Sequence, residues 1–263
     1  EDGKTAQSRS YMWLYGSGND GLPPIRLYEY QPGRGGYHAE EFLKGFSGYL
    51  TCDGFSGYNK LKKVIRCGCL AHMRRYWYDA LPGKMKTASE RPPAEIGFDY
   101  CNQLFKLEEK YAGLDADTRK AKRLETEPAI WEAYWSWLET VNPTGGSRLE
   151  KAVTYARNQK PYMENYLLDG RCSISNNIAE NIARPYAVGR KNFLFHDTVK
   201  GARSSAIIYS LVETAKLNNL NIYAYLETVL LYMPDYKNEP EGIEELMPWS
   251  DMIQQRCRIE SKS

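Results

Sequence analysis

Residues 49–55 of the chain read YLTCDGF, a short apolar run that ends in the carboxylate Asp53 and a glycine turn. Such a run, bounded by glycine, predicts a strand with Asp53 at its end. Residues 176–185 read NNIAENIARP and predict a helix start that carries Glu180 in its first turn and stops at Pro185. Hard divalent cations prefer oxygen ligands. The two carboxylates therefore indicate a metal site suited to phosphoryl transfer.

The composition is that of a globular protein. The chain has 263 residues, of which 42% are hydrophobic and 26% charged, enough for one large domain or one domain with a sizeable insertion. No apolar run approaches the roughly 20 residues that cross a bilayer, and no signal-peptide pattern opens the chain. Six cysteines at irregular spacings then indicate a reduced, cytoplasmic protein.

The net charge is only +2, but the basic residues are clustered. Residues 60–75 contain six Lys and Arg and no acid, and residues 184–203 contain five against the single acid Asp197. Each cluster follows one of the two carboxylates. Basic flanks beside a metal-type acid site favour a polyanionic partner, whose phosphates attract Lys and Arg. The alternative interpretation is two solvated helical faces.

The hydrophobic periodicity predicts strands and helices in alternation over the first third of the chain. Strands are expected at 11–15, 25–30, 48–53 and 64–70, and helices at 38–46 and 71–81. The glycine-rich stretch between the first two strands predicts an antiparallel hairpin. This order predicts a mixed sheet with helices on its faces.

The remainder of the chain is predicted to be helical. Helices are expected at 94–112, 115–141, 147–168, 202–217 and 222–233, followed by a tail rich in proline and acids. Trp131, Trp135 and Leu138 recur at helical spacing and indicate a core stripe. The predicted division is a core at 1–83, an all-helical insertion at 84–169, a core helix carrying Glu180 at 170–204, and a helical C-terminal element at 205–263.

Several motifs, in this order along the chain, resemble the catalytic part of DDE transposases of the insertion-sequence sixty-six family. They are YMWLY at 11–15, CDGFSGYN at 52–59, GCLAHMRR at 68–75, DGR at 169–171, SNNIAE at 175–180, RPYAVGRKNFLF at 184–195, YSLVETAKLN at 209–218 and LMPW at 246–249. The resemblance covers nearly the whole chain and is weakest over residues 84–168.

This resemblance implies an RNase H-like α/β fold, in which three acids bind two Mg²⁺ ions, with Mn²⁺ as an alternative. Asp53 corresponds to the second acid and Glu180 to the third. The first acid belongs to the opening, central strand of the family's sheet. We expect that strand to precede residues 11–15 and to be absent from this chain, which would leave the fragment inactive. Asp2, Asp20 and Glu29 do not lie in the matching context.

The expected activity is metal-dependent cleavage and strand transfer of DNA at the ends of an insertion element. DNA phosphates are expected to contact Arg74, Arg75, Arg184, Arg190 and Lys191. His72, Asn176 and Asn177 are expected next to the metal ligands. The expected partners are DNA and further copies of the chain, without a membrane, in the bacterial cytoplasm and on the nucleoid when bound to DNA.

Other interpretations remain open for these residues. Asp53 could cap a turn before Gly54, Glu180 could pair with Arg184 one helical turn on, and His72 could be a packing residue. Asn177 could be a helix cap. The whole protein could be a relative that binds DNA or a protein without cutting. A two-carboxylate glycosidase is a further alternative, disfavoured by the basic clusters.

Overall fold

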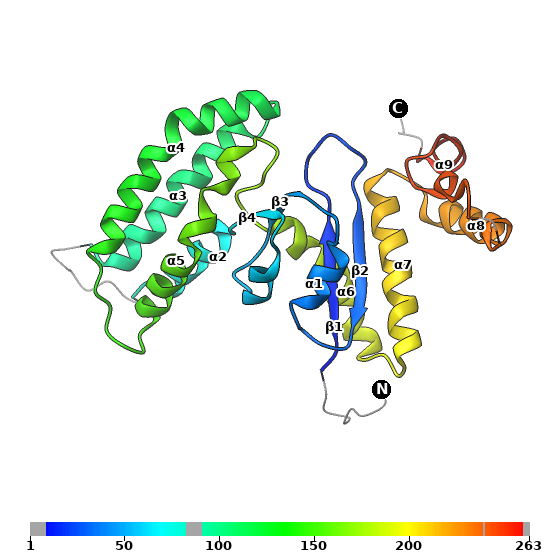
Figure 1. The fold of residues 1–263 in the computed structure, drawn as a ribbon, viewed down its shortest axis with the longest axis horizontal. Helices are drawn as coiled ribbons and strands as arrows, with labels where there is room; N and C mark the ends of the chain where they lie inside the picture. The colour runs from blue at the N-terminus through cyan, green and yellow to red at the C-terminus, as the bar shows by residue number, and fades with distance from the viewer. Residues whose placement is uncertain (1–8, 83–90, 239, 260–263) are drawn as a thin grey trace. The chain divides into compact units, whose positions relative to one another are not determined.

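The computed structural model describes residues 9–82, 91–238 and 240–259 and shows a mixed α/β protein (Figure 1). The chain divides into two compact units. The middle unit comprises residues 35–177, and the terminal unit comprises residues 1–34 and 178–263. Among the described residues, no helix combines the length and apolarity that a membrane crossing requires.

The middle unit contains the strand that precedes Asp53. This strand, β3 (Gly48–Thr51), pairs in parallel with β4 (Val64–Cys67). The pairing extends one residue further, because the Cys52 N–H donates to the Cys67 carbonyl at 3.1 Å. Both strands were predicted, with slightly later ends. A short 3₁₀ helix, η1 (Ser56–Lys60), lies within the connection between them.

Helices make up the rest of the middle unit. They are α1 (Tyr37–Phe42), α2 (Leu70–Asp79), α3 (Pro93–Tyr111), α4 (Ala116–Glu139), α5 (Arg148–Met163) and the 3₁₀ helix η2 (Asn165–Leu168). Asp115 and Ser147 cap α4 and α5 by accepting from the Thr118 and Glu150 amides. The predicted helices therefore form, with ends shifted by a few residues.

The core of the middle unit is aromatic. Trp77 and Trp131 have no exposed surface, and Tyr134 is 1% exposed. Trp131 stacks on Trp135, with ring centroids 5.4 Å apart. The predicted stripe of residues 131, 135 and 138 is thus confirmed as core, and its burial ties α4 to α2, α3 and α5.

The terminal unit begins with the predicted hairpin. Strand β1 (Tyr11–Gly16) pairs antiparallel with β2 (Arg26–Gln31). Helix α7 (Val199–Leu217) lies along β2 (Figure 1). The hydroxyls of Thr214 and Ser210 accept from the Arg26 and Tyr28 amides at 3.0 and 2.9 Å, so α7 covers the outer edge of β2.

The predicted helix stop at Pro185 is wrong. Helix α6 (Asn177–Phe193) continues through Pro185, although proline removes one backbone donor. Tertiary packing accounts for the continuation, because Ile182 is buried against Tyr28 and Tyr186 packs against the same cluster. The Tyr28 hydroxyl also donates to the Ile182 carbonyl at 2.6 Å.

The predicted single mixed sheet is not formed among the described residues. The strands make two two-stranded sheets, β1–β2 in the terminal unit and β3–β4 in the middle unit. Within the described ranges, no strand forms backbone hydrogen bonds with both pairs, so the two pairs are not joined into one sheet. Each pair is instead covered by helices of its own unit.

The C-terminal tail is more ordered than predicted. After α8 (Ile222–Tyr232), the chain forms the 3₁₀ helices η3 (Met233–Tyr236) and η4 (Ile243–Leu246) and then helix α9 (Asp251–Cys257). The tail folds because three of its apolar residues, Leu246, Ile253 and Cys257, are buried. Ile253 and Cys257 pack in one cluster with Tyr225, whose hydroxyl donates to the Leu246 carbonyl at 3.2 Å.

Candidate nucleic-acid and metal site

Asp53 lies directly after β3, half-buried, next to the buried Cys52. Its Oδ1 accepts a hydrogen bond from the Phe55 amide at 3.0 Å, which is the turn expected before Gly54. Oδ2 makes no hydrogen bond within the residues that the structure describes. The turn-capping interpretation is therefore correct for one oxygen, and the other oxygen can still bind a ligand.

The turn after Asp53 packs tightly against α5. A side chain at Gly54 would place its Cβ 2.9 Å from the Tyr155 ring and 3.1 Å from Gln159 Nε2. Burial, with contributions from the Cys69 thiol and the Asp53 carboxylate, raises the pKa of Tyr155. Helix α5 therefore supports Asp53. Tyr155 and Gln159 could not be predicted as support for Asp53, because a polar residue within a helical pattern does not indicate a contact with another element.

A small pocket of about 270 Å³ opens beside this turn, lined by Gly54, Ser56, Asn59, Asn158, Gln159 and Tyr162. Gln159 is 7% exposed, and its Oε1 has no hydrogen-bond partner in the part of the chain that the structure describes. Behind Asn59, the buried Arg66 donates to the Asn59 side chain and stacks on the Tyr162 ring at 4.0 Å. The pocket is thus polar and adjoins the Asp53 turn.

Two of the residues expected beside the metal ligands meet at Cys69. The Cys69 Sγ accepts from the Asn176 amide and lies 3.2 Å from His72 Nδ1. Cys69 is fully buried at the start of α2, and the adjacent Leu70 amide donates to the Ile174 carbonyl at 3.0 Å. The segment that leads into α6 is therefore fixed on the start of α2.

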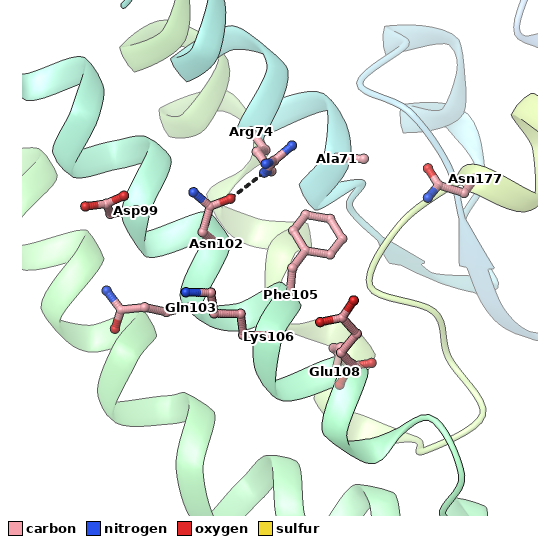
Figure 2. Close-up of a pocket in the computed structure, with 10 residues that line it drawn as sticks. Ala71, Arg74, Asp99, Asn102, Gln103, Phe105, Lys106, Glu108 and Asn177 are labelled. Atoms are coloured by element: carbon pink, nitrogen blue, oxygen red, sulfur yellow. Dashed lines mark hydrogen bonds between the residues drawn. The ribbon is translucent and has the colours of Figure 1, made fainter.

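Arg74 and Asn177 line a groove of about 720 Å³ beside α2 and α3 (Figure 2). The groove carries both signs of charge, from Arg74, Asp99, Lys106, Glu108 and Glu109. Arg74 Nε donates to Asn102 Oδ1 at 2.6 Å, and its guanidinium lies 4.5 Å from the centre of the Phe98 ring. Arg74 is thus held within the middle unit, whereas Arg75 is exposed.

In the terminal unit, Glu180 lies exposed in the first turn of α6. Arg184 makes no ion pair within the described residues, so the alternative pairing of Glu180 with Arg184 is not formed. Arg190 and Lys191 are exposed in the last turn of α6, where the helix dipole favours positive charge. These three cations are available to an anionic partner.

The middle unit holds Asp53, and the terminal unit holds Glu180. Their assignment to one metal site stays a prediction, as does DNA binding by the basic residues. Among the described residues, no group of three or more His, Cys, Asp or Glu side chains is arranged to hold a metal ion. Asp53 and Glu180 nevertheless supply the carboxylate oxygens that Mg²⁺ prefers.

Comparison with known proteins identifies relatives over nearly the whole chain. The uncharacterized protein y4qI of Sinorhizobium fredii (strain NBRC 101917 / NGR234) is 31% identical over 265 residues, which cover 94% of this chain and 48% of y4qI. The uncharacterized protein y4hP of the same strain is 28% identical over 86% of this chain and 44% of its own length. The chain thus spans about half the length of these curated relatives. No solved structure matches it.

Two family models also match the chain. The model described as the transposase IS66 family covers residues 1–204, and that described as the IS66 C-terminal element covers residues 210–249. Together they include Asp53, Glu180 and all five predicted DNA contacts. The matches span both structural units. The chain therefore belongs to the IS66 family of transposases.

Proposed function

We propose that this chain is the catalytic region of a DNA transposase that cuts and joins DNA strands at the ends of an insertion element. The match to the transposase family over residues 1–204 is the observation that carries this proposal. Membership of that family implies interaction with DNA. The exposed cations of α6 support it, since Lys and Arg bind DNA phosphates irrespective of sequence.

The edges of the two small sheets support an RNase H-like fold for the complete protein. The outer edge of β2 is covered by α7, and at the outer edge of β4 the Arg66 carbonyl accepts from Asn165 Nδ2 at 2.6 Å. Backbone groups alternate in direction along a strand, so those of Leu14 in β1 and Thr51 in β3 point away from their partner strands. An open edge is a template for a further strand. We propose that a central strand from elsewhere in the protein pairs with both edges and supplies the first acid.

Asp53 and Glu180 would hold the metal ions in this proposal, in which the chain on its own is incomplete and inactive. Two bound Mg²⁺ ions supply charge neutralisation and a nucleophile of lowered pKa. Asp53 is suited to metal binding because β3 and α5 fix its backbone, and the Asn176 amide and His72 Nδ1 both contact the Cys69 thiol before α2. Arg75, Arg184, Arg190 and Lys191 would bind the DNA phosphates.

The proposed setting is the bacterial cytoplasm, with several copies of the chain assembled on DNA. Cleavage at both ends of one element within a single complex would use two active sites, which favours a homo-oligomer. The exposed apolar residues of α8, among them Leu230 at 75% and Leu231 at 63%, are available for contacts between copies.

The test compares variants of a protein in which this chain is joined to the proposed central strand. Asp53→Asn and Glu180→Gln are each expected to lower Mg²⁺-dependent cleavage of element-end DNA by at least about a hundredfold, because a lost carboxylate weakens the metal site. Asp197→Asn is the matched control, since Asp197 is an exposed acid in the same basic stretch. The control is expected to cleave at the parent rate.

Two results would overturn the proposal. Unchanged cleavage by both variants would remove Asp53 and Glu180 from the metal site. A parent protein that binds DNA with these cations yet cleaves none under any Mg²⁺ or Mn²⁺ condition would favour the non-catalytic alternative. In that case Arg190→Gln and Lys191→Gln would still weaken binding.

A further inference from the structure

An apolar tip projects from the connection between α6 and α7. Helix α6 ends at Phe193, α7 begins at Val199, and the two residues after α6 are Leu194 and Phe195 (Figure 1). Leu194 is 63% exposed and Phe195 70% exposed. Two adjacent large apolar side chains in solvent are unfavourable unless they meet a partner.

The tip is built on a fixed frame. The Phe193 ring packs against Tyr186 and His196, with centroids 5.9 and 4.8 Å apart, and the His196 Nε2 is hydrogen-bonded to the Tyr186 hydroxyl at 2.9 Å. Tyr186 in turn packs on Tyr209 of α7, with ring centroids 5.3 Å apart. The frame therefore holds Leu194 and Phe195 outward.

The backbone at the tip is strained in a way that folding does not require. Leu194 has a φ of 62°, in the left-handed region, and its amide donates to the Arg190 carbonyl at 2.8 Å. This is the residue after a helix, where glycine is favoured because a Cβ is unfavourable there. A leucine at this position adds strain and exposed apolar surface, so its side chain is better explained by a contact outside the unit.

Positive charge surrounds the tip. Arg190 and Lys191 lie in the last turn of α6, and Lys200 and Arg203 lie in the first turns of α7. All four are exposed, and within the described residues none is in an ion pair. The only acid between residues 184 and 203 is Asp197. The tip therefore favours a polyanion that also offers an apolar interior.

We propose that Leu194 and Phe195 form a wedge that inserts between neighbouring base pairs of DNA, while the four cations bind phosphates on both sides of the opened step. This inference rests on the proposed function and names a contact that holds DNA in a distorted form. Apolar side chains inserted between base steps unstack them and kink the duplex. Flexible pyrimidine–purine steps are the preferred place of insertion, because they unstack most readily.

The test uses a short DNA duplex with TA and CA steps in which 2-aminopurine replaces one adenine, because its fluorescence rises when the base is unstacked. Binding is measured separately, by fluorescence anisotropy at several salt concentrations. The parent chain is expected to bind, to raise the fluorescence, and to prefer a duplex with a mismatch at the step on the order of tenfold, since a mismatched base unstacks at lower cost.

Two wedge variants and one matched control separate insertion from binding. Phe195→Ala and Leu194→Gly are expected to abolish the fluorescence rise and the mismatch preference, and to weaken binding less than about threefold, because phosphate contacts dominate affinity. Leu194→Gly is expected to keep or raise the melting temperature, by roughly 2–4 °C, as the strain is relieved. Leu22→Ala, which removes a leucine that is 70% exposed in the hairpin between β1 and β2, is expected to behave as the parent.

Different failures point to different errors. Binding without any rise in fluorescence, or a rise that survives both wedge variants, overturns the wedge and leaves the DNA interface intact. A parent chain that does not bind DNA overturns the proposed interface as well. If Phe195→Ala instead converts an oligomer to a monomer and leaves the fluorescence rise unchanged, the tip contacts a second copy and the wedge is wrong.

Discussion

The two units of the chain differ in how they use apolar residues. The middle unit buries them, with Trp77, Trp131 and Tyr134 in one continuous core that joins α2, α3, α4 and α5. The terminal unit buries two smaller clusters, one around Tyr28 and Ile182 between its hairpin and helices, and one around Tyr225 and Ile253 in its C-terminal helices. Large apolar side chains such as Leu230, Phe195 and Tyr223 remain 70% or more exposed there.

This difference indicates a division of labour. The middle unit acts as a support, in which the pairing of β3 and the packing of Gly54 on α5 fix the position of Asp53. The terminal unit presents Glu180, the exposed cations of α6 and α7 and an apolar tip toward solvent. A partner that binds the folded terminal unit would stabilise it by mass action, and we expect this contribution to be larger than in the middle unit. The predictions below test whether the two units differ in this way.

The largest effect is expected from Arg123→Ala, which removes a buried cation at the centre of the middle unit. Arg123 is 1% exposed and binds both oxygens of Glu108, at 2.7 and 2.6 Å. It also donates to the carbonyls of Tyr166, Asp169 and Cys172. Removing one partner of a buried ion pair costs about 3–5 kcal/mol. Urea denaturation followed by tryptophan fluorescence measures this loss, since Trp77 and Trp131 lie in that core.

Lys122→Ala is the matched control for this prediction. Lys122 pairs with Glu125 at 2.8 Å, but both side chains are half-exposed or more, and such pairs contribute about 0–1 kcal/mol. If Arg123→Ala costs no more than Lys122→Ala, the loop at residues 166–172 is held by other contacts. That result would count against the proposed difference between the units, in which the middle unit is stable by itself and the terminal unit is stabilised by what it binds.

A second effect is expected from pH, through Glu127 in the same network. Burial, helped by the nearby Glu108 carboxylate, raises the pKa of Glu127 to about 7, although the Tyr166 hydroxyl bonds to it and Arg123 is close. A raised pKa means that the folded state binds the proton more tightly than the unfolded state. The contribution is therefore fully present below about pH 4.5 and is lost as the pH rises through about 7, with a maximum of about 3 kcal/mol.

Glu127→Gln is expected to remove this dependence, because the amide keeps the shape and stays neutral. The unfolding free energy of the variant should exceed that of the parent at pH 8 and approach it at pH 5. Glu125→Gln, at an exposed position two residues earlier in the same helix, serves as the control. If the unfolding free energies of the parent and of Glu127→Gln change in parallel between pH 5 and pH 8, the buried carboxyl group is ionised throughout and the prediction is wrong.

Much of the local structure could be predicted from the sequence. The hairpin of β1 and β2, the strand before Asp53 and the three long helices α3, α4 and α5 follow from hydrophobic period and turn residues. The predicted end of α6 at Pro185 is too early, because proline is a local helix breaker. The helix continues because Ile182 and Tyr186 pack against Tyr28, more than a hundred positions away in the sequence. Long-range packing of this kind leaves no local pattern.

The acidic residues of the candidate site could be predicted from the sequence, but the residues that pack against them could not. Asp53 at a strand end and Glu180 at a helix start are visible in short motifs, and both lie in the elements expected. Tyr155 and Gln159, which support the Asp53 turn, lie in a helix with no motif of its own. Their role depends on the missing side chain of Gly54, a packing constraint that appears only in three dimensions.

The smallest effect is expected from the hydroxyls that cover β2 in the terminal unit. Ser210→Ala and Thr214→Val leave the Tyr28 and Arg26 amides without their partners, and each partly buried unmet donor costs about 1 kcal/mol. Hydrogen exchange at these two amides should accelerate, while the tryptophan signal of the middle unit stays unchanged. Ser204→Ala, an exposed serine of the same helix, should alter neither.

The outcome of this last experiment bears directly on the contrast between the units. The double variant Ser210→Ala/Thr214→Val opens the second edge of a hairpin whose first edge, β1, already lacks a strand partner among the described residues. A two-stranded sheet with both edges open is marginal on its own. If DNA restores slow exchange at Tyr28 in the double variant, binding stabilises the terminal unit. If DNA binds and exchange stays fast, the unit's stability is independent of its partner, and the division of labour is wrong.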